Sequence, residues 1–353
     1  MKTIFSYSFS GVLSAIVLLA NSSAALACAT CGCALSSDAA MGFPSEGGWL
    51  VSVQYDFINQ SQYRHGTGAL SSGQVASIND NGGSQEVENG TLNRYTTLGI
   101  SYAVNQDWNF RLLLPYMDRS HSTYGQGTNP LTPSDLSYAN VSSVGDVKLI
   151  SSYQGLLPTH NWGFQLGLKL PTGDYGGPNA TGTGVVGRSP VSFSSGPIAG
   201  QGAGALLDTS LQAGNGSTDL ILGSYYFQPV SQDFDAFVSG QFQSSVAHQL
   251  KDVGADYRPG NSANISFGLR YEADPSLVPQ LQFNVTHKTA DQGALADTSD
   301  TAGTVVYLSP GITAMVGAGT HAYAFVQWPL YSQLAGYQLF PKWTASVGVA
   351  HSF

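Results

Sequence analysis

This sequence is short of charge. Charged residues make up 10% of its 353 residues, whereas an average soluble domain is roughly one quarter charged. Lys and Arg number 13 against 22 Asp and Glu, and this acidic balance argues against a nucleic-acid partner, which demands clustered basic residues. Cysteine is absent after residue 33. No apolar run of about 18 residues follows the first 27 residues, which excludes membrane-spanning helices.

Glycine and aromatic residues are abundant instead. The chain has 42 Gly, 18 Tyr and 16 Phe. Few charges, many aromatic rings and many glycines suit a protein that exposes apolar side chains to lipid. With helices excluded, the remaining way to cross a membrane is a closed β-barrel, in which every backbone polar group is paired between strands.

The first 27 residues have the layout of a secretory signal peptide. Lys2 gives a positive start, residues 11–20 form a short apolar core, and Ala25-Leu26-Ala27 places small residues where a signal peptidase reads. We therefore expect cleavage before Cys28. Lipidation of Cys28 is the alternative, although a lipobox has Leu three positions earlier, where this chain has Ala25.

Apolar and polar residues alternate along much of the chain, as they do in membrane strands. At 49–57 the apolar face carries Trp49, Val51, Val53, Tyr55 and Phe57, and the opposite face carries Ser52, Gln54 and Asp56. The same alternation recurs at 162–170, 281–288 and 343–350. It predicts about twelve strands, at 48–58, 92–104, 107–118, 144–154, 161–171, 217–228, 233–245, 261–272, 278–288, 303–315, 320–330 and 341–353.

The links between these strands alternate in length. Short links are predicted at 105–107, 156–161, 229–233, 274–278 and 317–320. Long links, rich in Gly, Ser and Asn, are predicted at 59–91, 119–143, 172–216, 246–260, 289–302 and 331–340. A soluble β-sandwich has no reason to sort its loops in this way, whereas outer-membrane barrels have short periplasmic turns and long extracellular loops. The sequence thus predicts an all-β, antiparallel, up-and-down transmembrane barrel of about twelve strands, with periplasmic termini and long extracellular loops.

The last strand ends in Phe353, after alternating apolar residues. This resembles the C-terminal strand by which the barrel assembly machinery recognises bacterial outer-membrane proteins. We therefore expect Phe353 to be an assembly signal.

Two hairpins carry a family resemblance. Residues 144–174 contain a Gly-Asp that opens a strand, a short turn, and a second strand that closes in "GLKLPTGD". These features, together with residues 217–243, resemble the outer-membrane family named for the meta-pathway of phenol degradation. The resemblance covers roughly residues 140–353 and implies a transporter-like barrel that passes small, often aromatic or apolar compounds.

Charged residues fall on the strand faces opposite the apolar stripes, where they would line the lumen. They are Asp56, Arg111, Asp146, Lys148, Lys169, Asp219, Asp235, Arg270 and Glu272. Mixed signs in a narrow lumen form either an ion-pair network that satisfies buried charges or a polar track for a solute. A barrel of about 12 strands lies between those filled by side chains and the open porins of about 16, which favours a narrow or gated pore.

Catalysis is not predicted. The seven histidines are scattered over loops and strand ends, and neither a GxSxG nucleophile motif nor an HExxH zinc motif is present. We therefore expect no enzyme and, apart from the cysteine segment below, no cofactor.

The three cysteines lie together in "CATCGC", at Cys28, Cys31 and Cys33. Haem attachment fails because position 32 is Gly and not the His that follows a C-x-x-C haem motif. Three interpretations stay open: a disulfide or a bond to a partner protein in the oxidising periplasm, a metal or redox role such as Cu(I) binding by soft sulfur ligands, and a lipid anchor at Cys28.

The sequence thus predicts a signal peptide at 1–27, a periplasmic cysteine segment at 28–47 and a barrel at 48–353 in the bacterial outer membrane. The expected function is a channel for passive or gated passage of small solutes, with the lipid bilayer, the barrel assembly machinery and the solute as partners. The alternative is a barrel that anchors a periplasmic redox or metal-handling assembly through its cysteines.

Overall fold

The computed structural model describes residues 47–179, 181–248, 256–294 and 296–353. The predicted signal peptide and all three cysteines lie outside the described residues. In the part of the chain that is described, no helix is long and apolar enough to cross a membrane.

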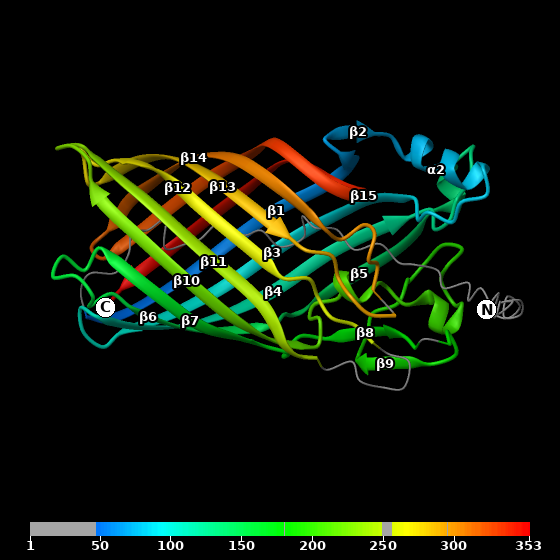
Figure 1. Cartoon of the computed structure of the whole chain (residues 1–353), viewed down its shortest axis with the longest axis horizontal. Coiled ribbons are helices and arrows are strands. Elements are labelled where there is room, and N and C mark those ends of the chain that lie inside the picture. Colours follow the sequence, from blue (N-terminus) through cyan, green and yellow to red (C-terminus); the bar gives the residue numbers. More distant parts are fainter. Residues whose placement is uncertain (1–46, 180, 249–255, 295) are drawn as a thin grey trace, which may run out of the picture.

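The described chain forms a closed, all-β, antiparallel barrel (Figure 1). The strands of the closed ring are β1 (Gly48–Gly66), β3 (Glu88–Ala103), β4 (Trp108–Thr123), β6 (Val147–Tyr153), β7 (Trp162–Leu170), β10 (Ser217–Pro229), β11 (Phe234–His248), β12 (Ser262–Tyr271), β13 (Leu277–Lys288), β14 (Gly303–Gly317) and β15 (Thr320–Ser352). Each pairs with the next along the ring, and β15 also pairs with β1. That last pairing closes the sheet and leaves the ring without an open edge.

Smaller elements gather at one end of the barrel, which we call the loop end (Figure 1). They are β2 (Gly68–Leu70), α2 (Ser72–Asp80), η1 (Pro133–Asp135), β5 (Ser137–Val144), β8 (Tyr175–Pro178), β9 (Val185–Arg188), η2 (Gly202–Ala205) and η3 (Thr209–Leu211). The helix α2 lies inside the link that the sequence predicts as a loop. It begins at a capping box, in which Ser71 and Gln74 satisfy each other's backbone N–H groups.

The opposite end, which we call the turn end, carries the short links and the chain terminus. Gly48 opens β1 beside Phe353, whose backbone N–H donates to the carbonyl of Trp49 over 2.9 Å. The first and last strands therefore meet at the turn end, where Figure 1 places the C-terminus.

Several strands are longer than the sequence predicts. β1 continues to Gly66 and β4 to Thr123, well beyond the predicted ends at 58 and 118. Tyr63, near the end of β1, packs with Leu339 and with side chains of the link that contains α2. Backbone pairing continues there while the simple alternation of apolar and polar residues stops, because the extended strands are covered by loops on their inner side.

The predicted link at 331–340 contains a chain reversal, as expected, but the strands on both sides continue into it. β15 runs without interruption from Thr320 to Ser352; its first half pairs with β14 and its second half with β1. Its two ends lie side by side, since Thr320 Oγ1 is 2.7 Å from His351 Nδ1, so β15 folds back on itself. The reversal falls near Gly336, whose φ of +53° favours glycine. The sequence there resembles a loop because its apolar residues do not follow a strict alternation of two.

The predicted strand at 144–154 begins later, as β6, and a further strand, β5, lies almost wholly in the predicted link at 119–143. β5 ends at Val144 and β6 begins at Val147, and both pair with β4. Gly145 lies in the break and donates its N–H to the carbonyl of Pro115 over 2.8 Å. An inward-turning loop meets the wall at this point, as described below.

Apolar side chains face outward and polar ones inward. Trp49, Leu166 and Leu281 are 51%, 56% and 46% exposed, whereas Asp56, Lys169 and Gln282 are 2%, 4% and 0% exposed. This is the reverse of a water-soluble fold, and it is the pattern of a barrel whose outer surface contacts lipid.

Candidate functional site

A cavity of about 350 Å³ lies inside the barrel. Side chains from β1, β3, β4, β6, β7 and β10 to β15 line it, so it is the lumen itself and not a pocket on one side. Its volume is at the lower end of the range for small-molecule sites, about 300–1,000 Å³. The lumen can therefore hold a small molecule.

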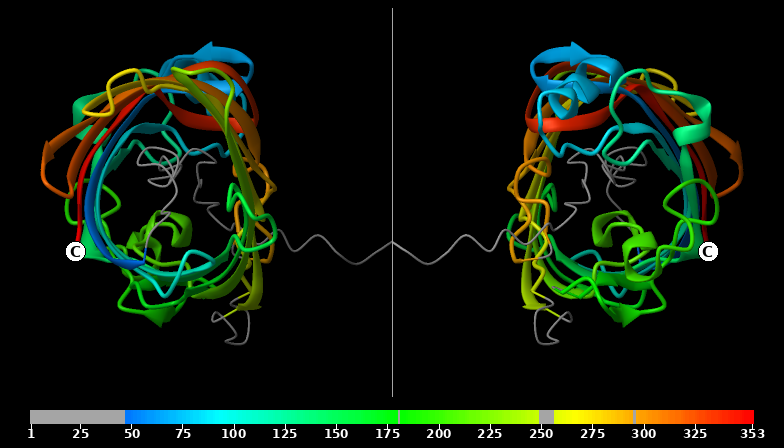
Figure 2. Two further views of the ribbon diagram at one scale, coloured as in Figure 1. Left: turned by 90° about the vertical axis from the view of Figure 1, so that its left-hand side faces the viewer. Right: turned by 90° about the vertical axis from the view of Figure 1, so that its right-hand side faces the viewer.

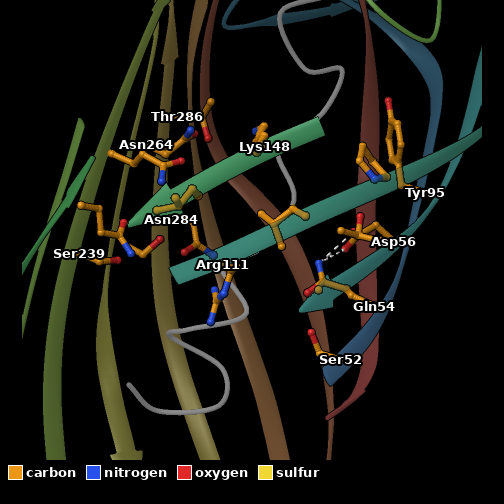
Figure 3. Close-up of a pocket in the computed structure, with 18 of the residues that line it drawn as sticks. Ser52, Gln54, Asp56, Tyr95, Arg111, Lys148, Ser239, Asn264, Asn284 and Thr286 are labelled. Atoms are coloured by element: carbon orange, nitrogen blue, oxygen red, sulfur yellow. Dashed lines mark hydrogen bonds between the residues drawn. The ribbon is translucent and has the colours of Figure 1, made fainter. Parts of the chain in front are cut away.

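One side of the cavity, which we call the charged wall, carries Asp56, Arg111 and Lys148 (Figure 3), together with Asp146. Asp56 accepts two hydrogen bonds of 2.9 Å from the Gln54 amide and a further one from Ser346. Arg111 donates from Nε to Ser101 Oγ over 2.9 Å. Two acidic and two basic groups thus face the cavity, and their formal charges balance.

Lys169 and Asp219 lie behind this wall. Lys169 Nζ is 2.9 Å from Asp146 Oδ2 and 3.4 Å from Asp219 Oδ2, and its side chain is 5% exposed. It also donates to Ser217 Oγ over 3.1 Å and to Asn215. Because these partners surround the ammonium group, Lys169 is part of a buried ion-pair network and does not line the cavity.

The "GLKLPTGD" motif surrounds this network and the break between β5 and β6. Thr172 Oγ1 donates to the carbonyl of Gly145 over 2.9 Å and accepts from the N–H of Val147 over 2.9 Å. A single side chain thus serves the backbone groups that the break leaves without a strand partner. The motif has a structural role in turning the next link inward.

Asp235, Arg270 and Glu272 lie apart from the cavity, near the turn end. Asp235 pairs in register with Arg270, whose guanidinium is 3.0 Å from Glu272 Oε1. The structure therefore separates the predicted charged residues into a cavity-lining group, a buried group and a group at the turn end.

The sequence did not reveal an apolar stripe inside the lumen. Leu113, Pro115 and Met117 on β4, with Ile150 on β6, line the cavity beside the charged wall. β4 is apolar on both faces over this stretch, so its alternation does not show which apolar side chains point inward. The one signal available in the sequence was that the three β4 residues follow Arg111 at intervals of two, which places them on the same face as its charged side chain.

The opposite side of the cavity, which we call the amide wall, is polar and uncharged (Figure 3). It consists of Ser239, Gln241, Asn264, Ser266, Asn284 and Thr286 from β11, β12 and β13. Asn284 donates to Ser309 Oγ over 2.7 Å and to Gln327 Oε1 over 3.3 Å. Its own Oδ1 is buried and has no hydrogen-bond partner among the described residues, so a residue that lines the cavity has an unused acceptor.

Inward aromatic rings leave the lumen open because they lie against glycines of neighbouring strands. A Cβ added at Gly311 would lie 2.1 Å from the ring of Phe325, and one at Gly163 would lie 2.2 Å from the ring of Tyr225. Only glycine permits so close an approach. The rings therefore pack against the wall, and the space at the centre remains.

Of the remaining predicted site residues, the structure describes Phe353. Phe353 is 76% exposed, and its ring packs edge-on against His351; its role as an assembly signal stays a prediction. Cys28, Cys31 and Cys33 lie outside the described residues, so their interpretations stay open. Within the described ranges, no group of three or more His, Cys, Asp or Glu side chains could hold a metal ion.

Comparisons with known proteins show the fold. No protein-family model matches the chain, and no curated protein matches its sequence. An outer membrane channel from Pseudomonas putida F1 is similar in structure, with a TM-score of 0.61 and 14% sequence identity over 88% of this chain and 97% of that one. The translocator domain of the autotransporter NalP from Neisseria meningitidis has a TM-score of 0.48 and 11% identity over 90% of this chain and 92% of that one. The resemblance to the phenol meta-pathway family stays a prediction.

Proposed function

We propose that this protein is a channel of the bacterial outer membrane through which small solutes with an apolar body and neutral hydrogen-bonding groups diffuse. The observation that carries the proposal is the lumen cavity, bounded by the apolar stripe on one side and the amide wall on the other. The apolar outer surface and the fold shared with an outer membrane channel support the same location and function.

The proposed barrel crosses the membrane twelve times. Each half of β15 counts as one crossing, because each half pairs with a different neighbour, and β5 and β6 together count as one. The start of the first strand and the end of the last strand then lie on the periplasmic side, at the turn end, and the loop end faces the cell exterior, as is usual for this class of protein.

The chemistry of the lumen supports this class of solute. Leu113, Met117 and Ile150 favour contact with an apolar body, whereas the buried acceptor of Asn284 favours a hydroxyl or an amide N–H. The balanced charges of the charged wall give no net attraction for an ion of either sign. Neutral amphipathic molecules, including aromatic ones, fit this surface better than free ions.

Current block in planar lipid bilayers tests the proposal. We expect the purified protein to conduct ions, and we expect phenyl glucoside, which has an apolar ring and hydroxyl groups, to reduce the current at lower concentration than glucose. The variant Leu113→Asn should bring the two blocking concentrations together, because it removes apolar surface from the lumen. Equal block by the two sugars in the unaltered protein would contradict the proposed solute class.

The same measurement separates the channel from the alternative function. A barrel that only anchors a periplasmic assembly need not conduct. Absence of any current from a correctly folded barrel would therefore favour the anchor, and the cysteine segment would become the place to look for function.

A further inference from the structure

Part of the longest link turns back into the barrel. Residues 189–216 connect β9 to β10 and contain η2 and η3. Their buried apolar side chains Phe193, Leu207, Leu211 and Ala213 pack on Met117 of β4 and on Ala139 and Val141 of β5. Because Met117 and Ala213 also line the lumen cavity, this segment forms part of its wall. When the barrel is viewed along its long axis, a green loop lies within the outline of the ring (Figure 2).

Arg119 connects the segment to the barrel. It follows Met117 on the inner face of β4, and it is 2% exposed. Its guanidinium donates to the carbonyl of Leu211 in the segment, and also to Asn93 Oδ1 and, over 2.8 Å, to Tyr95 Oη on β3. Arginine offers five donors in a fixed planar arrangement, so one side chain can hold a loop carbonyl and two strand residues together.

The two ends of the link, which we call its roots, are held together by hydrogen bonds. Asp146 accepts from the N–H of Gly173 over 3.1 Å and from the N–H of Asn215 over 3.3 Å, one on each root. Gly214 donates its N–H to the carbonyl of Asp174 over 2.6 Å. The link therefore leaves and re-enters the wall at one narrow neck, which Lys169 supports from behind. Beyond this neck, Arg119 contacts the segment inside the lumen.

We propose that residues 189–216 are the constriction of the channel, and that Arg119 is the positioning residue that holds them inside the lumen. The inference rests on the proposed function. It adds that the largest solute the channel admits is set by one segment and one arginine, and not by the circumference of the barrel. Solutes pass between this segment and the amide wall.

The narrow neck allows a clean test. Because Asp174 and Gly214 are hydrogen-bonded neighbours, residues 175–213 can be replaced by two glycines without moving the strands. The second variant is Arg119→Ala. Its matched control is Arg94→Ala, since Arg94 lies beside Asn93 on β3 at the same level but faces outward, paired to Asp118. Heat-dependent mobility on gels confirms that each variant is a folded barrel.

Single-channel conductance and the size of polyols that enter vesicles are measured for all four proteins. We expect excision to raise the conductance by roughly twofold or more and to admit larger polyols, because the narrowest section limits a pore. Arg119→Ala should show a mixture of the original and the larger conductance, and Arg94→Ala should match the unaltered protein.

Two outcomes would overturn the constriction, and they differ in what they say of the channel. If all four barrels conduct alike and admit the same polyols, the channel stands and the constriction is wrong. If none conducts, even after excision, both the constriction and the proposed function are wrong. A barrel that conducts only after excision would show that residues 189–216 close the unaltered lumen, which supports their position across it and contradicts the proposed channel.

Discussion

The charged wall and the amide wall face each other across one cavity, yet their polar groups differ in how fully they are hydrogen-bonded. On the charged wall, both carboxylates have several partners: Asp56 accepts from Gln54 and Ser346, and Asp146 is bound by Lys169 and by the backbone of Gly173 and Asn215. On the amide wall, Asn284 keeps a buried acceptor without a partner among the described residues.

The difference shows that one side of a lumen can stabilise the barrel while the other side is free to bind a solute. Charges buried without partners are costly, so the charged wall is satisfied internally and fixes the strands and the neck of the longest link. An unpaired neutral amide is less costly, and it can therefore be left for a solute. Substitutions should consequently affect stability on one wall and transport on the other.

The largest effect is expected for Lys169→Met. It leaves Asp146 and Asp219 facing each other without their shared cation, and removal of one member of a buried ion pair costs about 3–5 kcal/mol of unfolding free energy. Urea unfolding in lipid vesicles measures it, with the exposed Lys342→Met as control. A cost equal to that of the control would show that the charged wall does not stabilise the barrel.

Leu166→Arg should come next. Leu166 lies on the outer face of β7, the strand that carries Lys169 inside, and a cation near the centre of the lipid face costs about 2–4 kcal/mol. Gln165→Arg, which adds the same charge to the inner face, should cost less in the same unfolding assay. The opposite order would mean that inner and outer faces are assigned the wrong way round.

Asn284→Leu should have a smaller effect on stability and a clear one on transport. It removes hydrogen bonds to Ser309 and Gln327, each worth about 1 kcal/mol, together with the acceptor at the cavity. Phenyl glucoside should then block the current less effectively, while the block by glucose stays weak. Unchanged block would remove the amide wall from solute recognition.

The smallest effect is expected in a loop, where the local stability should depend on pH through Asp297. Burial, together with the neighbouring charge of Asp300, raises the pKa of Asp297 from 3.8 to about 6. The folded loop therefore holds the proton more tightly than the unfolded chain does, so its stability is complete below pH 3.8 and decreases as the pH rises to about 6.

Hydrogen exchange, corrected for intrinsic rates, should thus show more opening of residues 289–302 at pH 7.5 than at pH 4.5. The segment held by Arg119 serves as an internal reference. Asp297→Asn should reduce the dependence on pH, because an amide does not ionise in this range. A dependence of undiminished size in that variant would assign it to another group.

Alternation in the sequence was sufficient to predict the barrel and the facing of most strands. At Trp49 to Phe57, and again at Trp162 to Leu170, side chains point where a period of two places them, because lipid outside and a polar lumen inside impose opposite preferences on adjacent residues. The predicted strands were too short around 331–340 and at the ends of β1 and β4, where backbone pairing continues without the alternation.

The sequence by itself therefore determined the fold class, the acidic and weakly charged character of the chain, and which residues face inward on the strands that alternate clearly. Only the tertiary structure decided which inward charges are paired, which line the cavity, and which link turns into the lumen. The physical reason is how far apart in the sequence the interacting residues lie. Alternation is a property of adjacent residues, whereas the contacts of Lys169 with Asp146 and of Arg119 with Leu211 join residues 23 and 92 positions apart in the chain.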